Sequence, residues 1–189
     1  MKLLVIRSLL VARAAPPRWM ERLAKPVGIP VIIVCLLMVY GLVAGRIVLN
    51  GSDSLAARGF YVVVWPKPLI RGSIVVADPP AAVAQTFDGL VFAKRLVGLP
   101  GDPVIHSGDA VCILGACFAQ GTKDGDTYGS LMEAGRVPAG HVALFGETAT
   151  SLDSRYAEIG YFPIASIRGV GVAIPGFPSW EDIARRLGS

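Results

Sequence analysis

A run of 19 residues without a charge, Val27–Gly45, constrains this chain more than any other feature of its sequence. As a helix rising 1.5 Å per residue it would extend about 28 Å, close to the thickness of a bilayer's hydrocarbon core. Pro30 falls in the first turn, where its missing N–H costs little. A mean hydropathy of +0.57 also favours membrane association. We therefore predict a transmembrane helix over Val27–Gly45, in preference to a buried core helix or a cleaved secretory signal.

The basic residues are concentrated before this run. Residues 1–26 contain six Lys and Arg residues against Glu21 alone, a net charge of +5. The rest of the chain has 12 basic and 13 acidic residues, so we expect no nucleic-acid partner. Because Lys and Arg favour the cytoplasmic side, we predict a cytoplasmic segment at residues 1–26. Residues 46–189 are then a domain on the far side, which is the periplasm for the inner membrane of a Gram-negative bacterium.

The region after Arg46 is predicted to be mainly β. Six segments are short, rich in β-branched residues and separated by Pro, Gly and Asp, which is typical of strands joined by tight turns. These segments are Gly59–Trp65, Ser73–Asp78, Leu90–Gly98, Asp109–Leu114, His141–Gly146 and Ile164–Ile174. Few helical periods separate them, so we expect a compact antiparallel sandwich or barrel. A short C-terminal helix is predicted over Ser179–Ser189, with Ser179 as its cap.

Two of the three cysteines, Cys112 and Cys117, flank a Leu-Gly-Ala tip in VCILGACFA. The pattern indicates a hairpin across which the two cysteines could form a disulfide, and an oxidising compartment would preserve it. The alternative is a pair of small buried thiols. No His or further Cys lies at ligand spacing, so we expect neither a metal nor another cofactor.

Lys94 stands in FAKRLVGLPGD, in the middle of a predicted strand and among apolar neighbours. On an exposed strand face such a lysine is a solvated edge charge. In a buried groove it would lose hydration, which favours the neutral amine, and a neutral amine can take a proton from a serine hydroxyl. His106 and His141 could supply a Ser-His-Asp triad instead, but no G-x-S-x-G elbow accompanies them.

Three sequence blocks follow one another: SDSL at Ser52–Leu55, KRLVGLPGD at Lys94–Asp102 and SLDSRY at Ser151–Tyr156. Pro-Gly-Asp alone is a common turn, but the nine-residue middle block is more specific. In this order, after a predicted anchor, the blocks resemble those of type I signal peptidases, the serine-lysine proteases that free exported proteins from their membrane anchors. The resemblance covers most of residues 27–174 and implies a signal peptidase domain.

The resemblance implies a catalytic role for three of these residues. Ser54 would be the nucleophile, and Lys94 would be the general base that later protonates the leaving amine. The Ser54 N–H and the Ser52 hydroxyl would donate hydrogen bonds to the oxyanion. Without such a role, the two serines are ordinary loop residues.

The third block implies supporting residues. Ser151 would hydrogen-bond Lys94 and hold its rotamer. Asp153 and Arg155 would form an ion pair that fixes the block beside the lysine. The ordinary alternative for the last two is a surface pair that contributes little to stability.

The pattern NxxxSLxxRGFY over Asn50–Tyr61 is most similar to the conjugative-transfer (TraF-like) branch of the family, which processes pilin precursors. Some residues depart from the family's pattern. Ala56 replaces the proline expected after Ser-Leu, Gly146–Thr148 replaces glycine-aspartate-asparagine, and Ala157–Glu158 replaces an aromatic residue and glycine. The departures bear on the substrate more than on the chemistry.

The function expected from this resemblance is cleavage of a membrane-anchored preprotein or pilin precursor at the bilayer surface. Whether the acyl-enzyme is released to water or to a peptide amine, which would cyclise a pilin, stays open. Three alternatives remain: a housekeeping signal peptidase, a non-enzymatic anchored β domain of a conjugation or secretion assembly, and a self-cleaving repressor-type protein. The last would need a DNA-binding segment where this chain has its apolar run.

Overall fold

The computed structural model describes residues 18–123, 126–178 and 185, in two units that meet between Tyr40 and Gly41. Helix α1 covers Arg18–Ala44, so it begins before the predicted helix and ends one residue earlier, because Gly45 opens a strand. Its large apolar side chains from Ile29 to Val43 are exposed. Within the part of the chain that is described, no helix meets the length and hydropathy that a membrane crossing requires.

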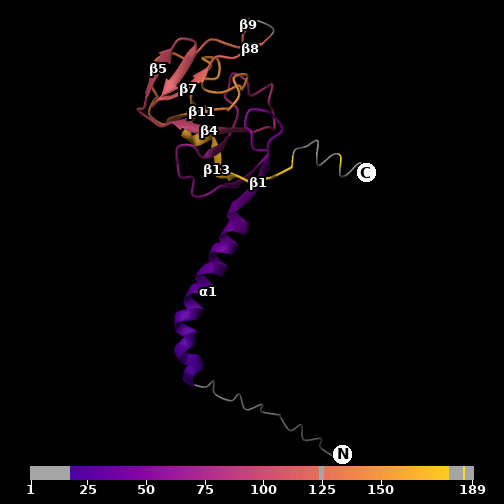
Figure 1. Ribbon diagram of the computed structural model, residues 1–189, viewed down its shortest axis with the longest axis vertical. Helices are drawn as coiled ribbons and strands as arrows, with labels where there is room; N and C mark the ends of the chain where they lie inside the picture. Colours follow the sequence, from indigo (N-terminus) through magenta and orange to yellow (C-terminus); the bar gives the residue numbers. More distant parts are fainter. Residues whose placement is uncertain (1–17, 124–125, 179–184, 186–189) are drawn as a thin grey trace, which may run out of the picture. The chain divides into compact units, whose positions relative to one another are not determined.

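The largest sheet has seven strands in the order β1-β2-β13-β3-β4-β11-β12, and every neighbouring pair is antiparallel. Strands far apart in sequence therefore lie side by side, because β13, the yellow strand near the end of the chain in Figure 1, pairs with both β2 and β3. The strands are β1 (Gly45–Leu49), β2 (Gly59–Val63), β3 (Ile74–Ala77), β4 (Phe92–Gly98), β11 (His141–Phe145), β12 (Phe162–Pro163) and β13 (Ile167–Ala173).

A second sheet has four strands in the order β10-β5-β6-β7, and a third pairs β8 with β9. Their bounds are β5 (Pro103–Ser107), β6 (Ala110–Ile113), β7 (Ala116–Ala119), β8 (Thr122–Lys123), β9 (Asp126–Thr127) and β10 (Gly135–Arg136), and a short 3₁₀ helix, η1, covers Ile164–Ser166. Cys112 and Cys117 are opposite each other on β6 and β7 and form a disulfide.

The prediction of a mainly β, antiparallel domain is confirmed, and each of the six predicted segments contains a strand. The last segment is only partly a strand, because η1 precedes β13. The sequence patterns did not predict β1, which directly follows the apolar run, β5, which begins with a proline, or the two-residue strands β8, β9, β10 and β12. The predicted helix at Ser179–Ser189 falls, apart from Arg185, outside the described residues.

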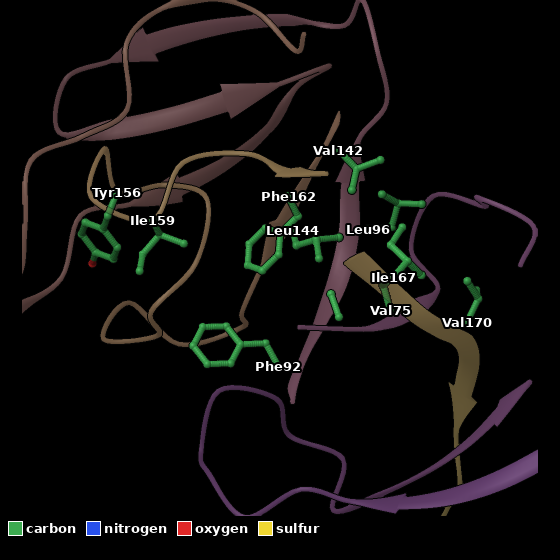
Figure 2. Packing of buried hydrophobic residues seen from close by; sticks show 11 residues of the cluster. Val75, Phe92, Leu96, Val142, Leu144, Tyr156, Ile159, Phe162, Ile167 and Val170 are labelled. Carbon is green, nitrogen blue, oxygen red and sulfur yellow. The ribbon is translucent and has the colours of Figure 1, made fainter. Parts of the chain in front are cut away.

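Buried and partly exposed residues alternate along β4, and this alternation places the Lys94 side chain on the buried face. Successive strand residues point to opposite faces, and in β4 Phe92, Lys94 and Leu96 are buried whereas the residues between them are partly exposed. Phe92 and Leu96 belong to the main apolar cluster, where they pack with residues from β3, β11, β12 and β13 (Figure 2). The Lys94 side chain is therefore buried on the same face of β4 as Phe92 and Leu96.

Candidate active site

The loop between β1 and β2, residues 50–58, is folded around the side chain of Asn50. This side chain is buried, and its Nδ2 donates hydrogen bonds to the carbonyls of Leu55, at 3.0 Å, and Ala57, at 3.1 Å. The residue between β1 and the loop thus holds the chain that follows Ser54. Ser54 itself is largely buried at the turn of this loop.

The two serines of the loop are in direct contact. Ser52 Oγ and Ser54 Oγ are 2.9 Å apart, and the Ser54 N–H points at Ser52 Oγ over 3.4 Å. Ser52 also donates to Asn50 Oδ1 from its backbone N–H and from its hydroxyl, each at 3.1 Å. A chain of three polar side chains therefore runs from Ser54 through Ser52 to Asn50.

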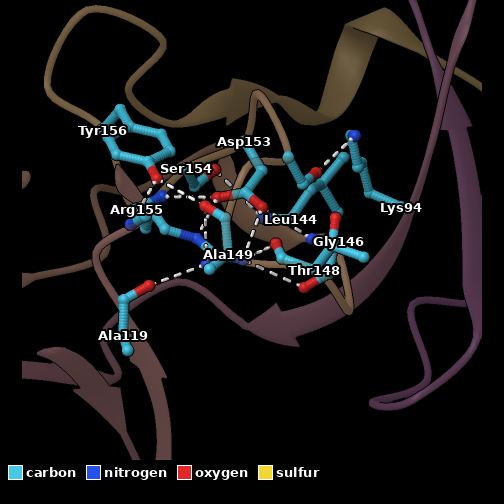
Figure 3. A network of polar contacts seen from close by, with 12 residues as sticks. Lys94, Ala119, Leu144, Gly146, Thr148, Ala149, Asp153, Ser154, Arg155 and Tyr156 are labelled. Carbon is cyan, nitrogen blue, oxygen red and sulfur yellow. Dashed lines mark hydrogen bonds and ion pairs between the residues drawn. The ribbon is translucent and has the colours of Figure 1, made fainter. Parts of the chain in front are cut away.

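The Lys94 side chain is 5% exposed, and its Nζ donates a hydrogen bond of 2.7 Å to Ser151 Oγ (Figure 3). Burial disfavours the ammonium form and is the largest effect on this group. The negative charge of Asp153 favours that form and the positive charge of Arg155 opposes it. Together these effects lower the pKa of Lys94 to about 8. A substantial fraction of the amine is therefore neutral near physiological pH.

Gly146, just after β11, connects the serine loop to the lysine. A Cβ at this position would overlap the Ser151 side chain and lie 2.9 Å from the carbonyl oxygen of Ser54. The same carbonyl accepts a hydrogen bond of 2.6 Å from the Glu147 N–H. Ser151, which holds Lys94, and the backbone of Ser54 are thus packed against one glycine.

Ser54 and Lys94 line the same cleft, which has a volume of about 750 Å³. Ser52 and Ser151 also line it. The remaining walls include apolar side chains from several segments, among them Val48, Leu49, Phe87, Leu90, Val91, Tyr128 and Leu152. An apolar cleft with a few convergent polar groups is typical of a binding or catalytic site.

Asp153 and Arg155 form an ion pair, and their side chains are 0% and 2% exposed. Arg155 Nε lies 2.9 Å from Asp153 Oδ1, and the Gly146 N–H donates to Asp153 Oδ2 at 2.7 Å. The pair is therefore buried and is not the surface pair considered as the alternative. The guanidinium also donates to a ring of backbone carbonyls (Figure 3), those of Ala119, Gly146, Thr148 and Ala149.

Asn50 and Glu147 make contacts that the sequence blocks did not predict. Glu147 Oε2 accepts a hydrogen bond from the Ala56 N–H, and its Oε1 pairs with Arg95 Nε, each at 2.6 Å. Burial acts to raise the pKa of Glu147, but these two contacts outweigh it and lower that pKa. The signal for Asn50 is the sequence Asn-Gly-Ser, which is typical of a turn in which the asparagine side chain accepts the N–H two residues on.

The structure thus brings together all six residues that the sequence blocks singled out. Ser54, Ser52, Lys94 and Ser151 line one cleft, and the charges of Asp153 and Arg155 both act on Lys94. A serine hydroxyl, an amine with a lowered pKa and nearby N–H and O–H donors form a set suited to acyl transfer. Among the described residues, no group of three or more His, Cys, Asp and Glu side chains is placed to hold a metal ion.

The chain is similar to known signal peptidases. The family model described as "Signal peptidase, peptidase S26" matches residues 20–175. The crystal structure of a signal peptidase I from Enterococcus faecalis is similar to this chain with 26% sequence identity and a TM-score of 0.36, over 55% of this chain and 97% of the other. No curated protein matches the chain significantly.

The burial of the Asp153–Arg155 pair leads to a prediction about stability. Asp153→Ala would leave the guanidinium of Arg155 buried without its partner, so we expect it to lower the free energy of unfolding by about 3–5 kcal/mol. Denaturant unfolding of the full-length chain measures the loss. The matched control is Asp78→Ala, which breaks the exposed pair with Arg168 and should shift the midpoint little. Equal losses in the two variants would contradict the prediction.

Proposed function

The chain belongs to the signal peptidase family, peptidase S26, and on that premise we propose that it is a serine endopeptidase with Ser54 as nucleophile and Lys94 as general base. The observation that carries this proposal is the buried amine of Lys94, whose pKa is lowered to about 8 and which shares a cleft with Ser54. An ammonium with an ordinary pKa would hold its proton at neutral pH and could not act as a base.

The proposed reaction begins when Ser54 Oγ attacks the scissile carbonyl and its proton passes to Lys94 Nζ. The oxyanion of the tetrahedral intermediate accepts hydrogen bonds from the Ser54 N–H and the Ser52 hydroxyl. As the intermediate collapses, the Lys94 ammonium gives its proton to the leaving amine, and an acyl-enzyme remains. Ser151 keeps the amine oriented throughout, because its hydroxyl accepts the hydrogen bond from Nζ.

The substrate class follows from the family and the cleft. Signal peptidases act on exported preproteins, and we propose a precursor whose extended cleavage segment lies along the apolar walls of the cleft. The NxxxSLxxRGFY pattern favours a conjugative pilin precursor, and Ala56 in place of proline is the residue that weakens this choice. A housekeeping signal peptidase is the second candidate. The acyl acceptor is water in simple cleavage and a peptide amine in cyclisation.

We propose that α1 anchors the enzyme in the bacterial inner membrane, with the amino terminus in the cytoplasm and the β domain in the periplasm. The support is the uncharged run Val27–Gly45 and the exposure of its large apolar side chains, because side chains that avoid water need another apolar environment. Anchoring the enzyme and its substrate in one plane raises the effective concentration of their encounter.

The nucleophile and the base can be tested together. We expect Ser54→Ala and Lys94→Ala each to lower cleavage of a co-expressed pilin precursor by at least about 10³-fold, because either change removes the proton transfer that activates the hydroxyl. Mass spectrometry of the pilin measures cleavage and distinguishes a linear from a cyclic product. His106→Ala and His141→Ala are the controls and should cleave at the parental rate. Parental cleavage by either dyad variant would refute the serine-lysine mechanism.

The lowered pKa of Lys94 predicts the pH dependence of cleavage. Only the neutral amine is a base, so kcat/KM should be constant above a pKa of about 8 and fall tenfold per pH unit below it. Initial rates between pH 5 and 10 with a soluble peptide substrate measure this profile. A single inflection near 6.5, lost in a histidine variant, would instead assign the base to that histidine.

The proposed anchor predicts where the protein fractionates. The full-length chain should stay in the membrane pellet after an alkaline carbonate wash. Val34→Lys together with Leu37→Lys should release it, since each lysine costs about 3 kcal/mol at the centre of a membrane helix. The matched control, alanine at the same two positions, should remain in the pellet. Release of the parental chain by carbonate would rule out the anchor.

A further inference from the structure

We propose that Asn50 is a positioning residue of the active site, which holds the Ser52 hydroxyl ready and releases it to the developing oxyanion. This inference rests on the proposed serine-lysine mechanism and on the role of Ser52 in it. Nothing in the three sequence blocks points to Asn50, because it precedes the first of them. The contacts of Asn50 indicate this role, because its buried side chain forms hydrogen bonds with the backbone on both sides of Ser54 and with the side chain of Ser52.

The orientation of the Asn50 amide follows from its partners. Leu55 and Ala57 present carbonyl oxygens, which only accept, so the atom facing them must be the NH₂ group. The other end of the amide is therefore the oxygen, and it faces Ser52. This oxygen accepts hydrogen bonds from both the N–H and the O–H of Ser52, so the partners at both ends of the amide fix its orientation.

The positions of the hydroxyl protons follow in turn. Each serine has one hydroxyl proton, and the Ser52 proton is directed to Asn50 Oδ1. The contact of 2.9 Å between the two serine oxygens then requires Ser54 to donate and Ser52 to accept. In this state the Ser54 proton points towards Ser52, whereas the Lys94 amine is bonded to Ser151. The arrangement is a resting state in which the nucleophile is not yet paired with its base.

Substrate changes this pattern through Ser52. As negative charge develops on the carbonyl oxygen, the Ser52 hydroxyl rotates about its Cβ–Oγ bond and donates to that oxygen, while the Ser54 proton passes to Lys94. Asn50 Oδ1 stays satisfied during this change, because it keeps the hydrogen bond from the Ser52 N–H. The rotation therefore leaves no buried acceptor without a partner, and such an acceptor would otherwise add to the barrier.

A double-mutant cycle tests this role, using the full-length enzyme and a fluorogenic peptide that the parental enzyme cleaves. We expect Ser52→Ala to lower kcat by about 10²-fold, as for the loss of one oxyanion donor. Asn50→Ala should lower kcat about tenfold or more with KM changed less than about twofold, because the donor remains but is no longer held. In the Ser52→Ala background, Asn50→Ala should have almost no further effect. Asn50→Asp keeps an acceptor for the Ser52 proton but places a carboxylate oxygen against the carbonyls of Leu55 and Ala57, so its kcat should fall and should show the same dependence on Ser52.

Several outcomes would overturn the proposal. Losses in kcat that multiply in the double variant would mean that Asn50 acts independently of Ser52, and an effect on KM alone would make it a binding residue. If both Asn50 variants melt at the parental temperature and cleave with the parental kcat, Asn50 does not position Ser52. The proposed function fails separately, because full cleavage by Ser54→Ala would refute it whatever the cycle shows.

Discussion

The burial of one amine is the constraint on which the rest of this site depends. Lys94 lies inside because β4 alternates between core and surface, and the same alternation places Phe92 and Leu96 in the main cluster. A shift of one residue in the register would expose the lysine and bury Arg95 in its place. Burial lowers the pKa of Lys94, so the packing of an ordinary strand sets the acid–base property that the proposed mechanism needs.

The lysine needs a nucleophile beside it, and the chain supplies one from a separate loop. Two adjacent residues after β11 make this connection. Gly146 leaves room for Ser151 and for the Ser54 carbonyl, and Glu147 bonds that carbonyl through its N–H and the Ala56 N–H through its carboxylate. Because Glu147 also pairs with Arg95, the neighbour of Lys94, the serine loop is linked to the strand that carries the base.

The residues that the sequence singled out lie together in the structure, whereas parts of the fold around them were not predicted. The resemblance of three sequence blocks to type I signal peptidases singles out Ser54, Lys94 and Ser151, whereas the sequence alone left open whether Lys94 is buried. β1 was not predicted because only Arg46 separates its apolar residues from the apolar run before it, and only pairing with β2 makes Gly45–Leu49 a strand. Asn50 was missed for a related reason, since its partners are backbone carbonyls whose positions depend on the folded loop.

The ion pair of Asp153 and Arg155 shows why the third block carries two opposite charges and not one. Asp153 alone would favour the ammonium form of Lys94 and so oppose its use as a base, whereas Arg155 acts in the opposite direction. With both present, the two charges act in opposite directions, and burial, the largest effect, determines the direction of the shift. Asp153 can then hold the Gly146 N–H, and Arg155 the surrounding carbonyls, without the charge of either residue dictating the protonation of Lys94. The pair therefore gives the site rigidity while leaving the amine free to exchange its proton.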